Sequence, residues 1–110
     1  GMINVLSEVR ANGGKEIKSF GIDIDDTITQ AINDGVITGT LVQNSAAMGY
    51  ISMLTLKYMA EGYRIADGVY AIDSGCAVVT KDNIDNYQPA LDAVRDSIIA
   101  ELTTKYLVKD

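Results

Sequence analysis

The sequence predicts one domain of the α/β class, and three observations point to it. Residues 17–44 contain an apolar stretch, then apolar residues at helical spacing, then a β-branched alternating stretch, which is the pattern of a βαβ unit. A longer apolar segment of helical length follows. The C-terminal segment again repeats apolar residues at three- and four-residue spacing. We therefore expect a parallel βαβ unit, a long helix, a short β segment and a C-terminal helix.

The elements up to the second strand can be placed in order. A helix is expected from Met2 to Asn12, because its apolar residues recur at helical spacing before a Gly-Gly pair. The apolar run Ile17–Ile22 predicts the first strand of the βαβ unit. Gly35 has the position of a C-terminal cap for the helix that follows. The stretch Val36–Val42 predicts the second strand, joined to the first by a right-handed crossover.

Polar side chains gather at the ends of these two strands. Asp23 follows the first strand, and Gln43 and Asn44 follow the second. In parallel sheets ligands bind beyond the carboxyl ends of the strands. A carboxylate accepts hydroxyl hydrogen bonds and a carboxamide both accepts and donates them, so these three residues are candidates for binding a polyol. Asp25 and Asp26 are expected to cap the N-terminus of the intervening helix.

The longest helix is expected from Ala46 to about Gly62, with Ser45 as its N-cap. Its apolar residues spread around most of the circumference rather than along one stripe, so more than one side needs to be covered. They are Met48, Ile51, Met53, Leu54, Leu56, Tyr58 and Met59. We therefore expect the chain to form a homodimer or a higher oligomer.

The remaining segments alternate between polar turns and short apolar stretches. Gly62–Gly68 predicts a loop, and Val69–Ile72 and Cys76–Thr80 predict short strands. Pro89 fits the first turn of a final helix that runs toward the C-terminus. We expect the Cys76 side chain to be a small buried hydrophobe.

Composition and charge exclude several classes of function. The net charge is −6 and the scattered Lys and Arg residues form no basic stripe, so no nucleic-acid partner is expected. The chain has no histidine, which excludes a His-based catalytic triad, and one cysteine, which excludes an internal disulfide. We expect no metal and no cofactor. No apolar run reaches membrane-spanning length and no signal peptide is recognisable, so the compartment stays open.

Four stretches together resemble the C-terminal part of the sugar-binding periplasmic proteins of ABC importers, the ribose-binding-protein-like family. They are Phe20–Asp23, Ala31–Asn44, Met48–Tyr50 and Ile72–Asp85. The same fold forms the effector domain of LacI-type transcription regulators. The resemblance implies a fragment of a type I periplasmic-binding-protein-like fold over residues 1–88, with residues 89–110 as a C-terminal helical extension.

The resemblance also implies a function and a set of contacts. Family members capture a small carbohydrate without catalysis and deliver it to a membrane ABC permease. Asp23 and Gln43 match the family's carboxylate and amide ligands of the sugar hydroxyls. The chain is expected to cross between two lobes near Gln43–Asn44 and again near Ile72–Cys76. The first lobe and the aromatic residues that stack on the sugar ring lie outside the resemblance, so we expect this chain alone to bind sugars very weakly or not at all.

A rival motif overlaps the same residues. Asp23 to Thr27 also reads as the DxDxT motif of haloacid-dehalogenase-like phosphatases, which depend on Mg²⁺. There Asp23 would be the nucleophile and Asp25 the general acid and base. That chemistry needs a later Ser or Thr, a Lys and an acidic pair at successive strand ends, which the short remainder does not offer. We therefore expect a binding protein rather than an enzyme.

Overall fold

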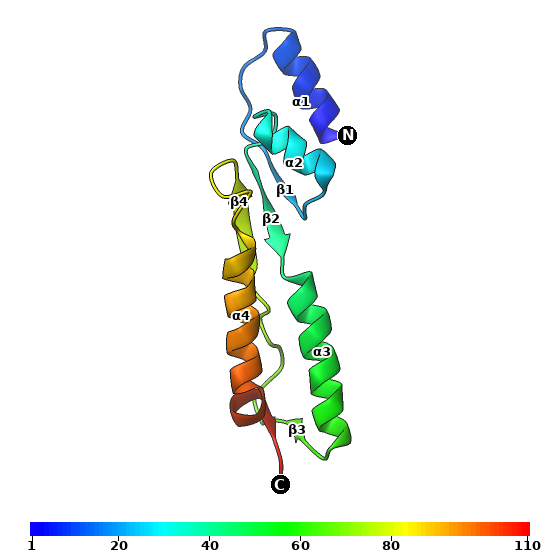
Figure 1. Cartoon of the computed structure of the whole chain (residues 1–110). Helices are drawn as coiled ribbons and strands as arrows, with labels where there is room; N and C mark the ends of the chain where they lie inside the picture. The colour runs from blue at the N-terminus through cyan, green and yellow to red at the C-terminus, as the bar shows by residue number, and fades with distance from the viewer. The chain divides into compact units, whose positions relative to one another are not determined.

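The protein combines helices and small sheets, and the α/β class is confirmed (Figure 1). The computed structural model describes residues 1–110. The chain folds into two compact units: residues 1–43 with 77–87 form the first unit, and residues 44–76 with 88–110 form the second unit. The residues expected as a C-terminal extension, 89–110, thus join residues 44–76 in one unit.

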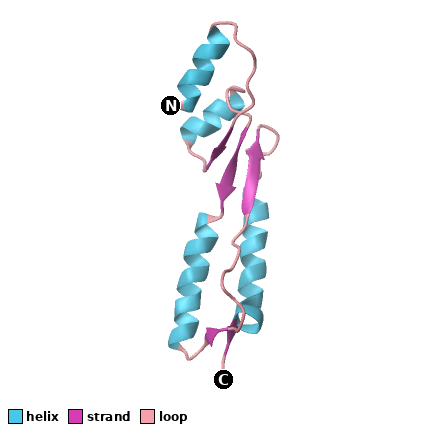
Figure 2. Ribbon diagram, turned by 180° about the vertical axis from the view of Figure 1, so that it is seen from behind, coloured by secondary structure: helices cyan, strands magenta, loops and turns pink.

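The first unit holds the βαβ motif and one further strand. Its elements are α1 (Met2–Ala11), β1 (Phe20–Ile22), α2 (Asp26–Asn33), β2 (Gly39–Gln43) and, apart from its first residue, β4 (Cys76–Thr80). The strand order is β1-β2-β4, and β1 pairs with β2 in parallel, with Phe20 beside Gly39 and Ile22 beside Leu41. The predicted parallel pairing is confirmed. Figure 2 shows β4 running opposite to the other two strands.

Two local signals define α2 as the sequence predicts. Asp25 is the N-cap, and its side chain accepts a hydrogen bond from the Ile28 backbone N–H at 2.7 Å. Gly35 follows the helix with φ +72°, a left-handed conformation that costs glycine little. Both strands are shorter than predicted. The Ser19 N–H donates to the Thr38 hydroxyl at 3.1 Å, so a side chain replaces the backbone acceptor and the regular pairing starts one residue later.

The core of the first unit lies on one face of its sheet. Ala31 and Ile32 of α2 are buried, as are Thr40 and Val42 of β2 and Val79 of β4. Phe20 and Ile22 of β1 are exposed instead, at 59% and 64%. The sheet is therefore covered on one face only.

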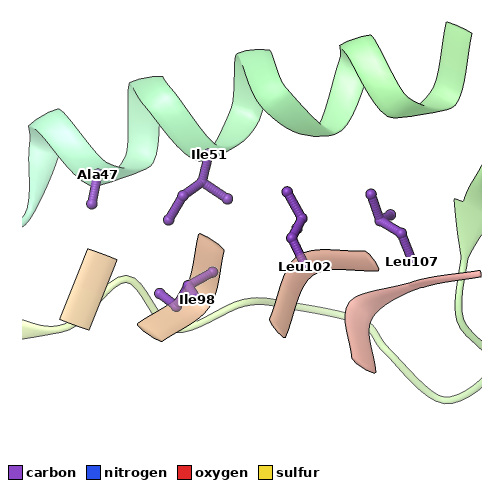
Figure 3. Close-up of a cluster of buried hydrophobic side chains, with 5 residues drawn as sticks. All are labelled: Ala47, Ile51, Ile98, Leu102 and Leu107. Carbon is purple, nitrogen blue, oxygen red and sulfur yellow. The ribbon is translucent and has the colours of Figure 1, made fainter. Parts of the chain in front are cut away.

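The second unit is built around a pair of helices. Its elements are α3 (Ser45–Ala60), β3 (Arg64–Ile65), α4 (Gln88–Glu101), the π-helix η1 (Leu102–Tyr106) and β5 (Leu107–Val108). Strands β3 and β5 pair antiparallel, with Arg64 beside Val108 and Ile65 beside Leu107. Five buried side chains from α3 and from the chain after residue 97 form the core (Figure 3). They are Ala47, Ile51, Ile98, Leu102 and Leu107.

Several boundary predictions in the second unit are wrong. The N-cap of α3 is Asn44, not Ser45, and the helix ends at Ala60 rather than Gly62. Residues 69–72 form no strand, and the predicted loop contains β3 instead. The final helix does not continue to the C-terminus, because the chain turns through η1 into β5. These two-residue strands exist only because they pair with each other across the unit, which local sequence does not encode.

One prediction about burial also needs correction. Cys76 is exposed rather than buried. Helix α3 buries only Ala47 and Ile51, whereas Met53 and Leu56 are 68% and 59% exposed. The expected oligomer stays a prediction. No helix of the structure has the length and apolar character needed to cross a membrane.

Candidate functional site

Asp23 lies directly after β1 and its backbone is held on both sides. Its N–H donates to the Leu41 carbonyl oxygen at 2.8 Å, and its own carbonyl oxygen accepts from the Thr40 hydroxyl at 2.6 Å. Thr40 is fully buried, so the hydroxyl group that holds the Asp23 carbonyl belongs to the core of the first unit. Asp23 has φ +67°, the left-handed conformation that Asp and Asn tolerate better than other side chains. These bonds fix where the exposed carboxylate stands at the strand end.

Gln43 is the last residue of β2 and meets Asp23. Its Nε2 donates a hydrogen bond to Asp23 Oδ1 at 3.2 Å, and both residues are exposed. The parallel pairing of β1 and β2 brings the two strand ends to the same edge of the sheet, as the sequence predicts. A carboxylate and a carboxamide therefore stand side by side, already joined by one hydrogen bond.

Asn44, the third candidate, is the first residue of the second unit. Unlike Gln43, it is buried, with 3% exposure. Its Nδ2 donates to the carbonyl oxygens of Ser74 at 3.0 Å and Leu91 at 2.8 Å. Its Oδ1 accepts from the Ala47 N–H at 3.3 Å. The side chain thus holds three backbone groups together. A ligand role for Asn44 would require breaking these buried bonds.

The chemistry open to the Asp23–Gln43 pair follows from its free atoms. One carboxylate oxygen of Asp23 and the amide oxygen of Gln43 accept no hydrogen bond from another side chain. No ion pair of the chain includes Asp23, so its negative charge is not compensated by a neighbouring cation. Such a pair suits a neutral ligand with adjacent hydroxyl donors and disfavours an anion.

The acidic residues after Asp23 have local structural roles. The carboxylate of Asp25 receives the Ile28 N–H as an N-cap, and Asp26 begins α2 in its first turn. Both positions favour negative charge because the helix N-terminus is positive. No group of three or more acidic, histidine or cysteine side chains is arranged to hold a metal ion.

A cavity that the sequence reasoning missed lies in the second unit, along the exposed side of α3. It has a volume of about 450 Å³ and is lined by Met48, Ser52 and Leu56 of α3 together with Ile72 and Ser74. Neither Asp23 nor Gln43 lines it. The sequence feature that indicates this cavity is the spread of apolar residues around α3. They include a side of the helix that the rest of the unit leaves uncovered.

Comparison with known proteins adds no further constraint: no protein-family model, no curated protein and no solved structure matches this chain.

Proposed function

We propose that this chain is a non-catalytic carbohydrate-binding fragment, related to the substrate-binding component of an ABC sugar importer, in which Asp23 and Gln43 receive the sugar hydroxyls. The observation that carries the proposal is the hydrogen bond between Gln43 Nε2 and Asp23 Oδ1. Two neighbouring hydroxyls of a sugar can replace that bond, because one donates to the carboxylate while another accepts from the amide. In this context the partner of the loaded protein is a membrane ABC permease.

The path of the chain supports the same proposal. The chain leaves the first unit after Gln43 and returns to it after Cys76. The resemblance to periplasmic sugar-binding proteins implies crossings between lobes at these same places. The amide ligand is thereby expected beside the point where the chain passes from one compact unit to the other.

The binding is expected to be weak. Asp23 and Gln43 are both exposed, so a sugar bound there keeps most of its surface in water. Hydrogen bonds that compete with water contribute about 1 kcal/mol each, and association itself costs at least ~4 kcal/mol. Two such bonds do not offset that cost, so we expect a dissociation constant far above ~1 mM.

A titration followed by NMR tests this proposal at the level of residues. Pentoses and hexoses are added to the ¹⁵N-labelled chain, and the amide and side-chain signals are followed to high sugar concentration. We expect saturable shifts at Asp23 and Gln43 with at least one sugar. The shifts should vanish in Asp23→Asn and Gln43→Leu and persist in Asp85→Asn, which removes an exposed carboxylate of the same unit that makes no side-chain hydrogen bond.

Two results would contradict the proposal. A micromolar dissociation constant would show that the chain holds a complete site, which two exposed groups do not explain. An absence of saturable shifts at Asp23 and Gln43, with every sugar tested, would remove these residues as the site.

A phosphatase is the less favoured function. Its general acid and base would be Asp25, whose Oδ1 is engaged by the Ile28 N–H at 2.7 Å. Helix capping explains an aspartate at position 25 without a catalytic role, since an aspartate at an N-cap stabilises a helix by about 1 kcal/mol.

A further inference from the structure

The edge of the sheet in the first unit is open along β1. The strand order β1-β2-β4 leaves β1 with a neighbour on one side only. The Asp23 N–H points toward β2, where it meets the Leu41 carbonyl oxygen. Because backbone groups alternate along a strand, the N–H and C=O groups of Phe20 and Ile22 point the other way, to the open side. Such groups form a template for another strand.

Apolar side chains accompany these backbone groups. Phe20 and Ile22 are two residues apart, so both side chains stand on the same face of the sheet. They are 59% and 64% exposed, and Val78 of β4 is 58% exposed. The buried residues of this sheet, Thr40 and Val79 among them, show that the other face is the covered one. The open edge therefore borders an uncovered apolar surface.

The charges on either side of β1 have opposite signs. Lys15 and Lys18 precede the strand, with one glutamate between them, whereas Asp23, Asp25 and Asp26 follow it. A parallel copy of this segment would place like charges beside each other. An antiparallel copy places the basic end of each strand beside the acidic end of the other, which is electrostatically favourable.

We propose that β1 is a self-pairing edge, which docks antiparallel against β1 of a second copy of this chain. A two-fold axis at Gly21 places Phe20 opposite Ile22 of the partner. Residues with outward-facing backbone groups then oppose each other, and each such pair exchanges both of its N–H···O bonds. In this register Lys18 lies opposite Ile24, between Asp23 and Asp25 of the other copy. The contact is isologous, as two-fold symmetry requires.

The small size of the edge sets the strength of this contact. Strand β1 contains three residues, so the buried surface falls below the ~1,000 Å² that a stable interface needs. The dimer is therefore weak and forms reversibly at high protein concentration. The contact reaches Asp23, one of the proposed sugar ligands, so sugar binding is measured at low protein concentration, where the chain is a monomer and the two proposals are tested separately.

Sedimentation and hydrogen exchange test the self-pairing. We expect the average mass to rise with concentration toward that of a dimer between ~10 µM and ~1 mM, the range of weak complexes. The Phe20 and Ile22 amides should exchange more slowly as concentration rises, and the other amides of the sheet should not change. An antiparallel edge contact protects these two donors specifically, because they alone in β1 face outward.

Substitutions then test whether the dimer forms through the β1 edge or through another surface of the chain. Lys18→Glu should raise the dimer dissociation constant roughly tenfold or more by placing like charges together, which corresponds to about 1.4 kcal/mol. Ile22→Pro should abolish the dimer, because it removes a backbone N–H that faces the open edge. If Ile22→Pro unfolds the unit, Phe20→Lys takes its place, since a lysine on an edge strand opposes pairing. Lys109→Glu makes the same charge change in the second unit and should have no effect.

Three results would overturn the proposal. The first is a monomer at every concentration. The second is a dimer that survives both Lys18→Glu and the edge substitution. The third is a dimer lost in Leu56→Lys, with the β1 amides unprotected, which would assign the contact to the exposed apolar side of α3.

Discussion

Asn44 Nδ2 donates a hydrogen bond of 2.8 Å to the carbonyl oxygen of Leu91, a residue 47 positions away in the sequence. Both residues are buried, at 3% and 2% exposure. The same amide group holds the Ser74 carbonyl, and the amide oxygen caps α3. One side chain therefore joins three segments of the second unit. Its contribution to folding can be tested by measuring the free energy of unfolding of a variant.

We expect Asn44→Ala to lower the free energy of unfolding by about 3 kcal/mol, because buried carbonyl groups lose their donors and α3 loses its cap. Urea denaturation followed by circular dichroism measures this. Asn4→Ala, an exposed substitution on α1 that breaks no side-chain bond, should change stability by less than ~0.5 kcal/mol. An Asn44→Ala variant with unchanged stability would argue against the role of Asn44 in joining these three segments.

The capping role of Asp25 predicts a different pattern. Asp25→Ala should cost about 1 kcal/mol, whereas Asp25→Asn should retain most of the stability because an asparagine oxygen also accepts the Ile28 N–H. Thermal denaturation of the two variants checks this. If Asp25→Asn leaves stability unchanged but removes a Mg²⁺-dependent phosphatase activity of the chain, the enzyme hypothesis gains over the binding hypothesis.

Two glycines should respond to alanine with opposite signs. Gly35 has φ +72°, so Gly35→Ala strains the end of α2 and should destabilise by about 1 kcal/mol, although an added methyl group would meet only Arg10 Nη1, at an ordinary contact of 3.9 Å. Gly49 lies inside α3, and a Cβ added there would meet no atom within 4 Å, so Gly49→Ala should stabilise by roughly 0.5–1 kcal/mol. The melting temperatures of the two variants should therefore move apart. A shift of both in the same direction would contradict this account.

The pKa of Lys57 should lie above its ordinary value. Its ammonium group is held by a hydrogen bond to the Glu61 carboxylate, with N and O 3.1 Å apart on the surface of α3, and this contact raises the pKa. The folded state thus favours the charged lysine. The small stability it contributes is fully present below the ordinary pKa of 10.5 and is lost as the pH rises through the folded value.

An NMR titration of the Lys57 side chain measures this shift. Glu61→Gln should return the pKa toward its ordinary value, since the carboxylate is replaced by a neutral amide. An unchanged titration in Glu61→Gln would show that the exposed pair does not persist in solution.

Part of the fold follows from residues that act locally. Asp25 caps α2 and Gly35 ends it, because an aspartate oxygen accepts a helix N–H and glycine adopts positive φ without strain. The apolar stretches of the βαβ unit predicted two parallel strands. Parallel pairing then required Asp23 and Gln43 to meet, and they do. The candidate pair could therefore be found without a structure.

Other features were beyond local reasoning. The short strands β3 and β5 form through pairing between residues 64–65 and 107–108, and nothing in either segment specifies the other. Asn44 was predicted as a polar group for a ligand, yet only the folded unit places three backbone groups around its amide. A carboxamide has the same donors and acceptors in either role, so the sequence alone does not separate them.

The sequence by itself determined the α/β class, the parallel βαβ unit and the position of Asp23 beside Gln43, because hydrophobic periodicity and capping act over a few residues. Only the tertiary structure decided which surfaces stay open. Phe20, Ile22, Met53 and Leu56 have the same apolar character as the buried residues around them. Whether such a side chain is covered depends on what packs against it, and packing is a property of the whole fold.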